Sequence, residues 1–429
     1  MSMKNLVKLG NNKFINYFIF FIIFFLPFQN LGVGFGQAKN YDISYFLIYL
    51  LFINLFLKNI KFSYIIFISI FFLVNFYLFI SNFYFNYLEI PHYMSYNEYK
   101  IYYKFILSIL TINVYFLIFF YHTEINIDYE KIFVLFILIL LILLLTMIYM
   151  IIKNNFDFSL RYKATFNEPA YAGLFFYSSS LALFFTTFYE SNYFNKVFCG
   201  CLGLFIFFLA FISKSLHIVS FFVSFFFILF FLISNKFKIL IFISSIIVLI
   251  FIFQIDFIND KFKLESLLNL KNLNYNWGNR FAPQISFYVW IQNFEQYFHS
   301  FFLSPILGLG AGSIGFFKFD SLFFNLLNFK FITTLNLNDG YSLFLYLSIQ
   351  YGLIFVLPLL FFLVLKSRQF IKENFSNKNE INNKYIFFFV FSLTCIIGSL
   401  LKEPNLSRST LIFSFLIFTK VIYDYKKST

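Results

Sequence analysis

Residues 132–152 read IFVLFILILLILLLTMIYMII, an uninterrupted run of 21 residues without a charged side chain. A run of about 20 apolar residues is long enough for an α-helix to cross the hydrocarbon core of a bilayer. Lys131 and Lys153 flank the run on either side, as expected where a helix leaves a membrane. This stretch therefore predicts one transmembrane helix.

The composition extends this interpretation to the whole chain. Of the 429 residues, 61% are hydrophobic and 12% are charged, against roughly 25% charged residues in a soluble domain. The chain contains 78 Phe and 31 Tyr, so an aromatic cluster carries little functional information. Cys199, Cys201 and Cys395 all lie in apolar runs and offer neither a disulfide framework nor a zinc site.

Further apolar runs bring the predicted number of spans to about twelve. The first is read as an uncleaved span, because its apolar stretch continues through Pro27 without a small-residue cleavage site. Two of the runs are short, so the predicted number of spans allows an error of one pair of helices. We predict an all-α polytopic membrane protein with spans at residues 15–34, 43–57, 62–84, 105–122, 132–152, 169–189, 197–212, 216–234, 238–255, 340–365, 385–401 and 410–424.

The net charge of +13 is spread over many short loops. The chain has no dense block of Lys and Arg that would indicate nucleic acid as a partner. Attraction to anionic membrane lipid explains the positive charge better. With the N-terminus inside, 16 Lys and Arg fall in cytoplasmic loops and 9 in short outer loops, which is the asymmetry of the positive-inside rule. We therefore expect both termini in the cytoplasm.

The longest non-spanning region divides the chain into residues 1–255 with nine spans, an outer loop at 256–339 and residues 340–429 with three spans. Apolar residues recur at steps of three or four from Phe281 to Phe301, which predicts an amphipathic helix in the loop. The following segment, Gly310–Gly315, matches the spacing GxGxxG but has no strand before it, so a nucleotide fold is rejected. Its glycines permit close backbone approach or offer N–H groups to a phosphate.

Charged residues gather just before the sixth predicted span. Arg161, Lys163 and Glu168 lie within eight residues of one another, and Glu168-Pro169 opens the helix. An acidic residue and a proline at a helix start also suit simple capping. Two cations beside one carboxylate equally suit a ligand that carries phosphate and sugar hydroxyls.

Three more charged residues are candidates in other outer segments. Lys214 lies in the tight turn Ser213–His217, which is expected to set an ammonium and an imidazole near the membrane surface, and Arg408 lies between the last two spans. Asp339 precedes the tenth span, where it serves either as a helix cap or as a general base. A snorkelling Lys and a capping Asp are the simpler interpretations.

Four stretches follow one another in a characteristic order: Arg161–Gly173, Ser213-Lys214, Arg280 ahead of Ser304–Gly310, and Asn338-Asp339 followed by Leu345–Leu353. Taken in order, they resemble the O-antigen polymerase and ligase family of bacterial envelope polysaccharide synthesis. The sequence departs from the family at Lys214, where members often carry Arg, and at Asn338-Asp339, where the ligase branch typically carries His. The polymerase branch is therefore favoured.

The resemblance implies an enzyme that moves glycan from undecaprenyl pyrophosphate onto a lipid-linked repeat unit at the outer face of the bacterial inner membrane. Negative charge develops on the leaving pyrophosphate, and fixed cations can stabilise it. Arg161 and Arg280 are the candidates for that role. Asp339 is the first candidate for polarising the acceptor hydroxyl, and Glu168 is the second. The candidates for substrate binding are Lys163, Glu168, Lys214 and Arg408.

No cluster with the spacing of metal ligands is found in the sequence, so we expect neither a metal nor another cofactor. Expected partners are the lipid-linked oligosaccharide, membrane lipid and a chain-length regulator protein. The alternatives are an O-antigen ligase, which transfers glycan to lipid A core, a flippase for lipid-linked oligosaccharide, and a noncatalytic member of an envelope assembly complex.

Overall fold

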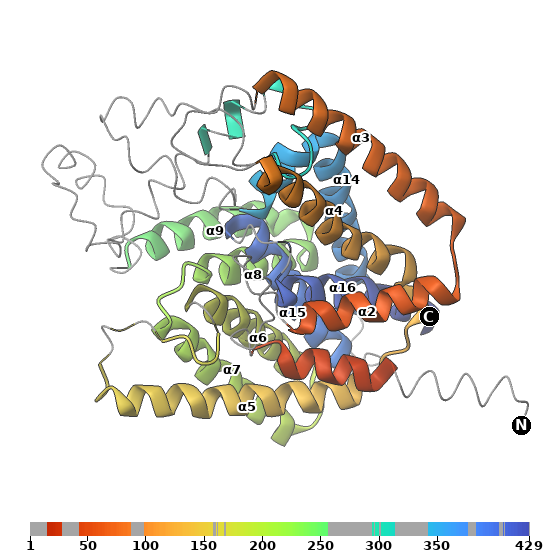
Figure 1. Ribbon diagram of the computed structural model, residues 1–429. Helices are drawn as coiled ribbons and strands as arrows, with labels where there is room; N and C mark the ends of the chain where they lie inside the picture. The colour runs from red at the N-terminus through yellow and green to blue at the C-terminus, as the bar shows by residue number, and fades with distance from the viewer. Residues whose placement is uncertain are drawn as a thin grey trace, which may run out of the picture.

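The computed structural model describes residues 15–27, 43–86, 98–157, 160, 162–166, 169–255, 294–295, 297–299, 302–313, 342–375, 383–402, 406 and 408–428. These residues form helices joined by turns, and no strand occurs among them (Figure 1). Within this part of the chain, eight helices are long and apolar enough to cross a membrane. Three shorter apolar helices, Ile15–Phe25, Ile43–Lys58 and Ile218–Leu232, accompany them. The protein is thus a multi-pass helical membrane protein, and the number twelve stays a prediction.

Each predicted span overlaps a helix. The helices after Ile15–Phe25 are α2 (Ile43–Lys58), α3 (Phe62–Asn86), α4 (Glu98–Tyr121), η3 (His122–Glu124), α5 (Tyr129–Lys153), α6 (Pro169–Tyr189), α7 (Tyr193–Ile212), α8 (Ile218–Leu232), η4 (Asn235–Phe237), α9 (Lys238–Phe253), α14 (Leu343–Asn374), α15 (Asn383–Lys402) and α16 (Ser409–Ser428).

Side-chain caps account for several helix starts. The side chains of Asp128, Asn192 and Ser342 accept hydrogen bonds from backbone N–H groups in the first turns of α5, α7 and α14, at 2.9–3.3 Å. Such caps satisfy donors that a helix start otherwise leaves unpaired. The end of α14 was predicted at residue 365 and is found at Asn374. Hydropathy missed these turns because they are amphipathic and alternate charged residues with the buried Phe370 and Ile371.

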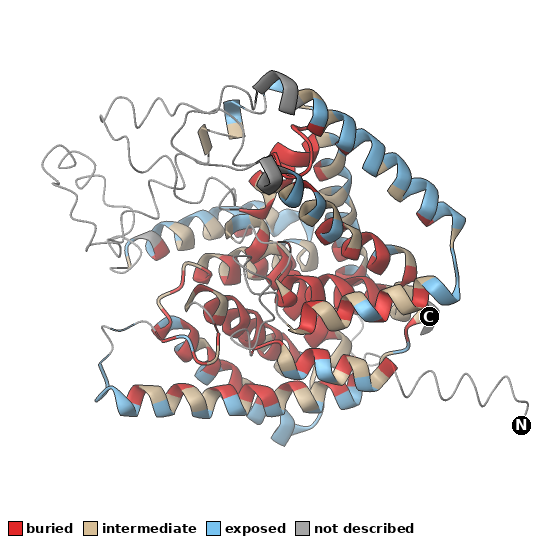
Figure 2. Cartoon of the chain, viewed as in Figure 1, coloured by how far each residue is buried: buried red, intermediate tan, exposed pale blue. Residues whose placement is uncertain are grey.

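The core lies around α6 and α15. Buried residues are concentrated on α6, α15 and α16, whereas α3, α5 and α9 expose long apolar faces (Figure 2). α6 packs against α7, α8 and α15, and α15 also packs against α16. Phe136, Phe175 and Phe391 interlock between α5, α6 and α15 with ring centroids 4.9–5.6 Å apart. Among the described residues, aromatic side chains therefore fill the core of the bundle and also cover its exposed apolar faces.

The helices alternate in direction, so their connections gather at two ends. One of them, called here the Asp424 end, is held by ion pairs Lys61–Glu124 (2.9 Å) and Lys384–Glu130 (2.6 Å). The Tyr129 hydroxyl donates to the Asp424 carboxylate at 3.1 Å and joins the start of α5 to α16 at this end. The opposite end, where α5 leads into α6, α7 into α8 and α15 into α16, is called the Arg408 end.

Candidate functional site at the Arg408 end

The start of α6 anchors the Arg408 end. Phe166, in the segment that precedes α6, is buried against Phe175 and Phe176 with ring centroids 5.4 and 6.1 Å away. The Thr165 hydroxyl donates to the Pro27 carbonyl at 2.8 Å and ties the segment to the first helix. These contacts hold the backbone that leads into α6.

Arg408 is bound to the first turn of α6 through Tyr171. Its Nη2 donates to the Tyr171 hydroxyl, and its Cζ lies 3.8 Å from the centroid of the Tyr171 ring. The Nε–H of Arg408 is buried and has no hydrogen-bond partner among the described residues. A buried donor without a partner costs about 1–3 kcal/mol, and an anionic oxygen placed beside it would remove that cost.

The turn Ser213–His217 packs on the same turn of α6. The Ser215 hydroxyl donates to the Ala170 carbonyl at 3.4 Å, one residue before Tyr171. A Cβ atom at Gly173 would lie 2.2 Å from Ser215 Cβ, so only glycine allows this approach. Lys214 adopts a left-handed conformation with φ of 50° at the tip of the turn. Lys214 and Arg408 are thus both placed by the first turn of α6.

His217 is fully buried and precedes the first residue of α8. Its Nδ1 lies 3.2 Å from the Ser220 hydroxyl, and its backbone N–H donates to the Ser215 hydroxyl at 3.3 Å. A Cβ atom at Gly398 of α15 would lie 3.0 Å from Ser220 Oγ, so α15 closes the cluster from the other side. His217 is therefore a packing residue that joins α6, α8 and α15.

The structure describes three of the seven predicted site residues. Arg408 contacts Tyr171 in the first turn of α6, and Lys214 lies in the turn whose Ser215 contacts Ala170 of the same helix. Lys163 is exposed in the segment before α6, next to the buried Tyr162, whose hydroxyl donates to the Asp157 carbonyl at 2.9 Å. The remaining predicted site residues, Arg161, Glu168, Arg280 and Asp339, lie outside the described residues, as does most of the predicted amphipathic helix.

Residues 305–312, called here the glycine segment, pack into a break in α14. Gly352 has φ 67° and ψ −178°, which interrupts the helix. The N–H groups of Leu309 and Gly310 donate to the carbonyls of Ile349 and Gln350 at 2.8 and 2.9 Å. In the same contact, the N–H groups of Leu353 and Ile354 donate to the carbonyls of Pro305 and Ile306 at 3.0 and 3.1 Å. Backbone groups freed by the break are thus satisfied within the protein, as a low-dielectric bilayer requires.

Two buried amide side chains hold the next residues of this segment. Asn75 Oδ1 on α3 accepts from the Ala311 N–H, and Gln350 Oε1 accepts from the Gly312 N–H, both at 3.1 Å. Gly312 lies against the backbone of α4, because a Cβ there would lie 2.8 Å from Phe105 N. The expectation of close backbone approach is therefore confirmed at Gly312. The alternative of phosphate-binding N–H groups fails for residues 309–312, because protein oxygens already occupy those donors.

Tyr297 covers this packing from the described part of the large loop. Its ring packs on the cluster of Leu309 and Ile349. Burial raises the pKa of the Tyr297 hydroxyl above its ordinary value, and a hydrogen bond with Ser348 acts in the opposite direction. The large loop and α14 are therefore joined by side-chain contacts as well as by backbone hydrogen bonds.

Sequence reasoning missed Tyr171, Asn75 and Gln350. Tyr171 accepts a hydrogen bond from Arg408, and the two amide side chains accept hydrogen bonds from backbone N–H groups of the glycine segment. The signal for Asn75 and Gln350 was available, because a polar side chain inside a predicted span needs a partner. Tyr171 was hidden by the abundance of tyrosine in the chain.

Among the described residues, no group of three or more His, Cys, Asp or Glu side chains could hold a metal ion. No protein-family model and no curated protein matches the chain. Arg408 and the turn that contains Lys214 both contact the first turn of α6. The Arg408 guanidinium lies over the Tyr171 ring and has a buried Nε–H without a partner among the described residues. Guanidinium groups are typical binding partners of phosphate and pyrophosphate.

Proposed function

We propose that this chain is an envelope polysaccharide polymerase. It transfers glycan from an undecaprenyl pyrophosphate-linked chain onto a lipid-linked repeat unit at the outer face of the bacterial inner membrane. The observation that supports it best is the half-buried Arg408, stacked on Tyr171 with an unpartnered Nε–H. A fixed guanidinium at a helix-bundle end matches the need of a leaving pyrophosphate.

The reaction breaks the bond between the anomeric carbon and the pyrophosphate oxygen, which keeps the electron pair. The acceptor hydroxyl attacks the anomeric carbon and releases its proton to a base. Arg408 and Lys214 bind the pyrophosphate, and the sequence assigns Arg161 and Arg280 to the developing charge. Asp339 is proposed as the base, with Glu168 as the second choice. Arg161 and Glu168 belong to residues 154–168, which link α5 to α6. Arg280 and Asp339 belong to residues 254–342, which link α9 to α14. Both connections join helices at the Arg408 end.

The proposal requires the Arg408 end to face outward. The loops of the Asp424 end are those counted as cytoplasmic above, and they contain the larger number of Lys and Arg. This assignment places both termini in the cytoplasm. Lipid-linked sugar donors at the outer face need no nucleotide, so the proposed reaction uses none.

A flippase is expected to place its charges along a central path through the spans. In the described residues the buried Lys420 on α16 lies 2.5 Å from the Asp424 carboxylate, at the end opposite Arg408. The charges of Lys420 and Asp424 neutralise each other, and Asp424 also accepts a hydrogen bond from the Tyr129 hydroxyl. The observation favours an enzyme with its site at one end.

The glycolipid ladder of a deletion strain separates the alternatives. Loss of a polymerase leaves surface lipid capped with a single repeat unit, which is the expected result. Loss of a ligase strands long polymer on its carrier, and loss of a flippase leaves no repeat unit on the surface. Either of these last two patterns rejects the polymerase proposal.

A further inference from the structure

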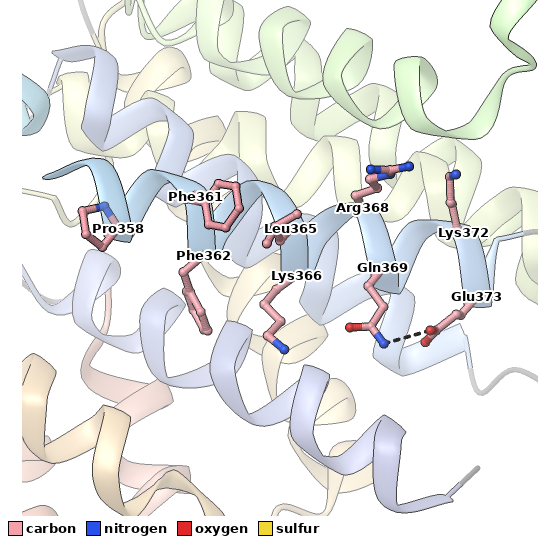
Figure 3. Close-up of a pocket in the computed structure, with 9 residues that line it drawn as sticks. All are labelled: Pro358, Phe361, Phe362, Leu365, Lys366, Arg368, Gln369, Lys372 and Glu373. Carbon is pink, nitrogen blue, oxygen red and sulfur yellow. Dashed lines mark hydrogen bonds between the residues drawn. The ribbon is translucent and has the colours of Figure 1, made fainter.

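The C-terminal half of α14 lines a groove of about 680 Å³ near the Asp424 end (Figure 3). Its polarity changes along the helix axis. Phe361 and Leu365 are 66% and 41% exposed, and the exposed Arg368 and Lys372 follow one and two turns later. The groove is lined by Pro358, Phe361, Phe362, Leu365, Lys366, Arg368, Gln369, Lys372 and Glu373.

The charges in the groove are mostly positive. Arg368 and Lys372 extend to one side of α14 and Lys366 to the other (Figure 3). Glu373 is the carboxylate among the lining residues, and it accepts a hydrogen bond from Gln369 Nε2 at 2.9 Å. Arg368 and Lys372 are four residues apart and therefore lie on the same face of the helix, where both can contact one anion.

The length of the groove matches one leaflet of a bilayer. Pro358 and Lys372 are fourteen residues apart, which corresponds to about 21 Å along a helix. Half of a hydrocarbon core is about 15 Å, and one headgroup layer adds about 5–7 Å. The apolar part of the groove therefore falls at acyl-chain depth and the cations fall at headgroup depth.

We propose that this groove binds an anionic phospholipid of the leaflet at the Asp424 end. An acyl chain lies over Phe361 and Leu365, and the phosphodiester lies between Arg368 and Lys372. This site is separate from the Arg408 end, and its existence does not depend on the polymerase proposal.

The test is native mass spectrometry of the purified full chain with equimolar dioleoylphosphatidylglycerol and dioleoylphosphatidylcholine. The wild-type chain is expected to retain phosphatidylglycerol preferentially. Each cation near a membrane surface contributes about fivefold in affinity, so Arg368→Gln with Lys372→Gln should lower phosphatidylglycerol affinity by about 30-fold. All positions in the test are exposed, so the variants should fold.

The matched control is Lys196→Gln with Lys236→Gln, which removes two exposed cations at the same end and outside the groove. This control should change the affinity by less than about twofold. Equal losses in both double variants, or no lipid preference in the wild-type chain, would overturn the site. Complete displacement of the lipid by excess inorganic phosphate would also overturn it, because the groove would then recognise free phosphate alone.

Discussion

Arg408 combines a contact with an aromatic ring and a buried donor without a described partner. Its stacking on Tyr171 restricts the guanidinium plane, while Nε is left without a partner in the described structure. A residue that only anchors a helix at an interface would extend its head group to water. Arg408 instead keeps its Nε–H buried and, among the described residues, without a hydrogen-bond partner.

This geometry predicts that Arg408→Lys fails nearly as badly as Arg408→Gln. The ammonium keeps the charge but loses the planar set of donors and the stacking. We expect Arg408→Gln to lower the polymerisation rate about 100-fold, and chain-length distribution in cells at matched protein level measures it. The control is Lys153→Gln, an exposed cation at the same end, which should keep wild-type chain lengths. Full-length polymer from Arg408→Lys would show that Arg408 is only an anchor.

The sequence makes a parallel prediction for three residues outside the described structure. If Arg161 and Arg280 contact pyrophosphate bidentately, Arg161→Lys and Arg280→Lys should each shorten the polymer almost as much as substitution by Ala. Asp339→Asn should also abolish polymerisation, since Asn preserves a helix cap but removes a base. Normal ladders from all three variants would place the site elsewhere at this end.

The residue-level site was only partly predictable. Lys163, Lys214 and Arg408 could be assigned to one side of the membrane by counting spans, and the structure places all three at one end. Their arrangement could not be predicted, because it depends on Tyr171 and on the glycine contacts at Gly173 and Gly398. A single sequence does not show which of many aromatic and small residues make long-range contacts.

At the level of elements, the break in α14 is the feature with the clearest physical requirement. Gly352 has a positive φ, and a Cβ there would lie 2.1 Å from the Ile306 carbonyl oxygen. Hydropathy predicted the span but not the break, because Leu, Ile and Phe surround Gly352 on both sides. Helix existence follows from apolar length, whereas a break depends on the glycine segment that supplies its hydrogen bonds.

Gly352→Ala should therefore destabilise the protein by about 3 kcal/mol or more, through backbone strain and steric overlap. The measurement is the fraction of monodisperse protein that survives heating in detergent, read by size-exclusion chromatography. Gly200→Ala in α7 is the matched control, because its nearest side-chain atom would be 3.5 Å away and alanine favours helix. Wild-type thermal stability of Gly352→Ala would contradict the observed packing of residues 305–310 on α14.

At the scale of the whole molecule, helix positions were the most predictable property. The predicted ranges overlap the observed helices because a bilayer demands long apolar runs. The packing order was not predictable, since α6 contacts α15 across more than 190 residues of sequence. Hydropathy carries no information about which helix faces pack against one another.

The two ends of the bundle make an orientation prediction. In a Cys201→Ser background, whose remaining cysteines are buried, Asn154→Cys at the Arg408 end and Ser234→Cys at the Asp424 end are both exposed positions. A maleimide that cannot cross the inner membrane should label Asn154→Cys in intact cells, and Ser234→Cys only after lysis. The reverse pattern would place the Arg408 end in the cytoplasm and exclude a reaction at the outer face.

The central claim is that the chain itself joins lipid-linked repeat units. The most direct measurement is a reaction of the purified protein with undecaprenyl pyrophosphate-linked repeat units isolated from the deletion strain, in the presence of a chelator and without nucleotide sugars. We predict a ladder of longer lipid-linked products from the wild-type chain, and a strongly reduced ladder from Arg408→Gln. Unchanged single repeat units after incubation with monodisperse wild-type protein would contradict the claim.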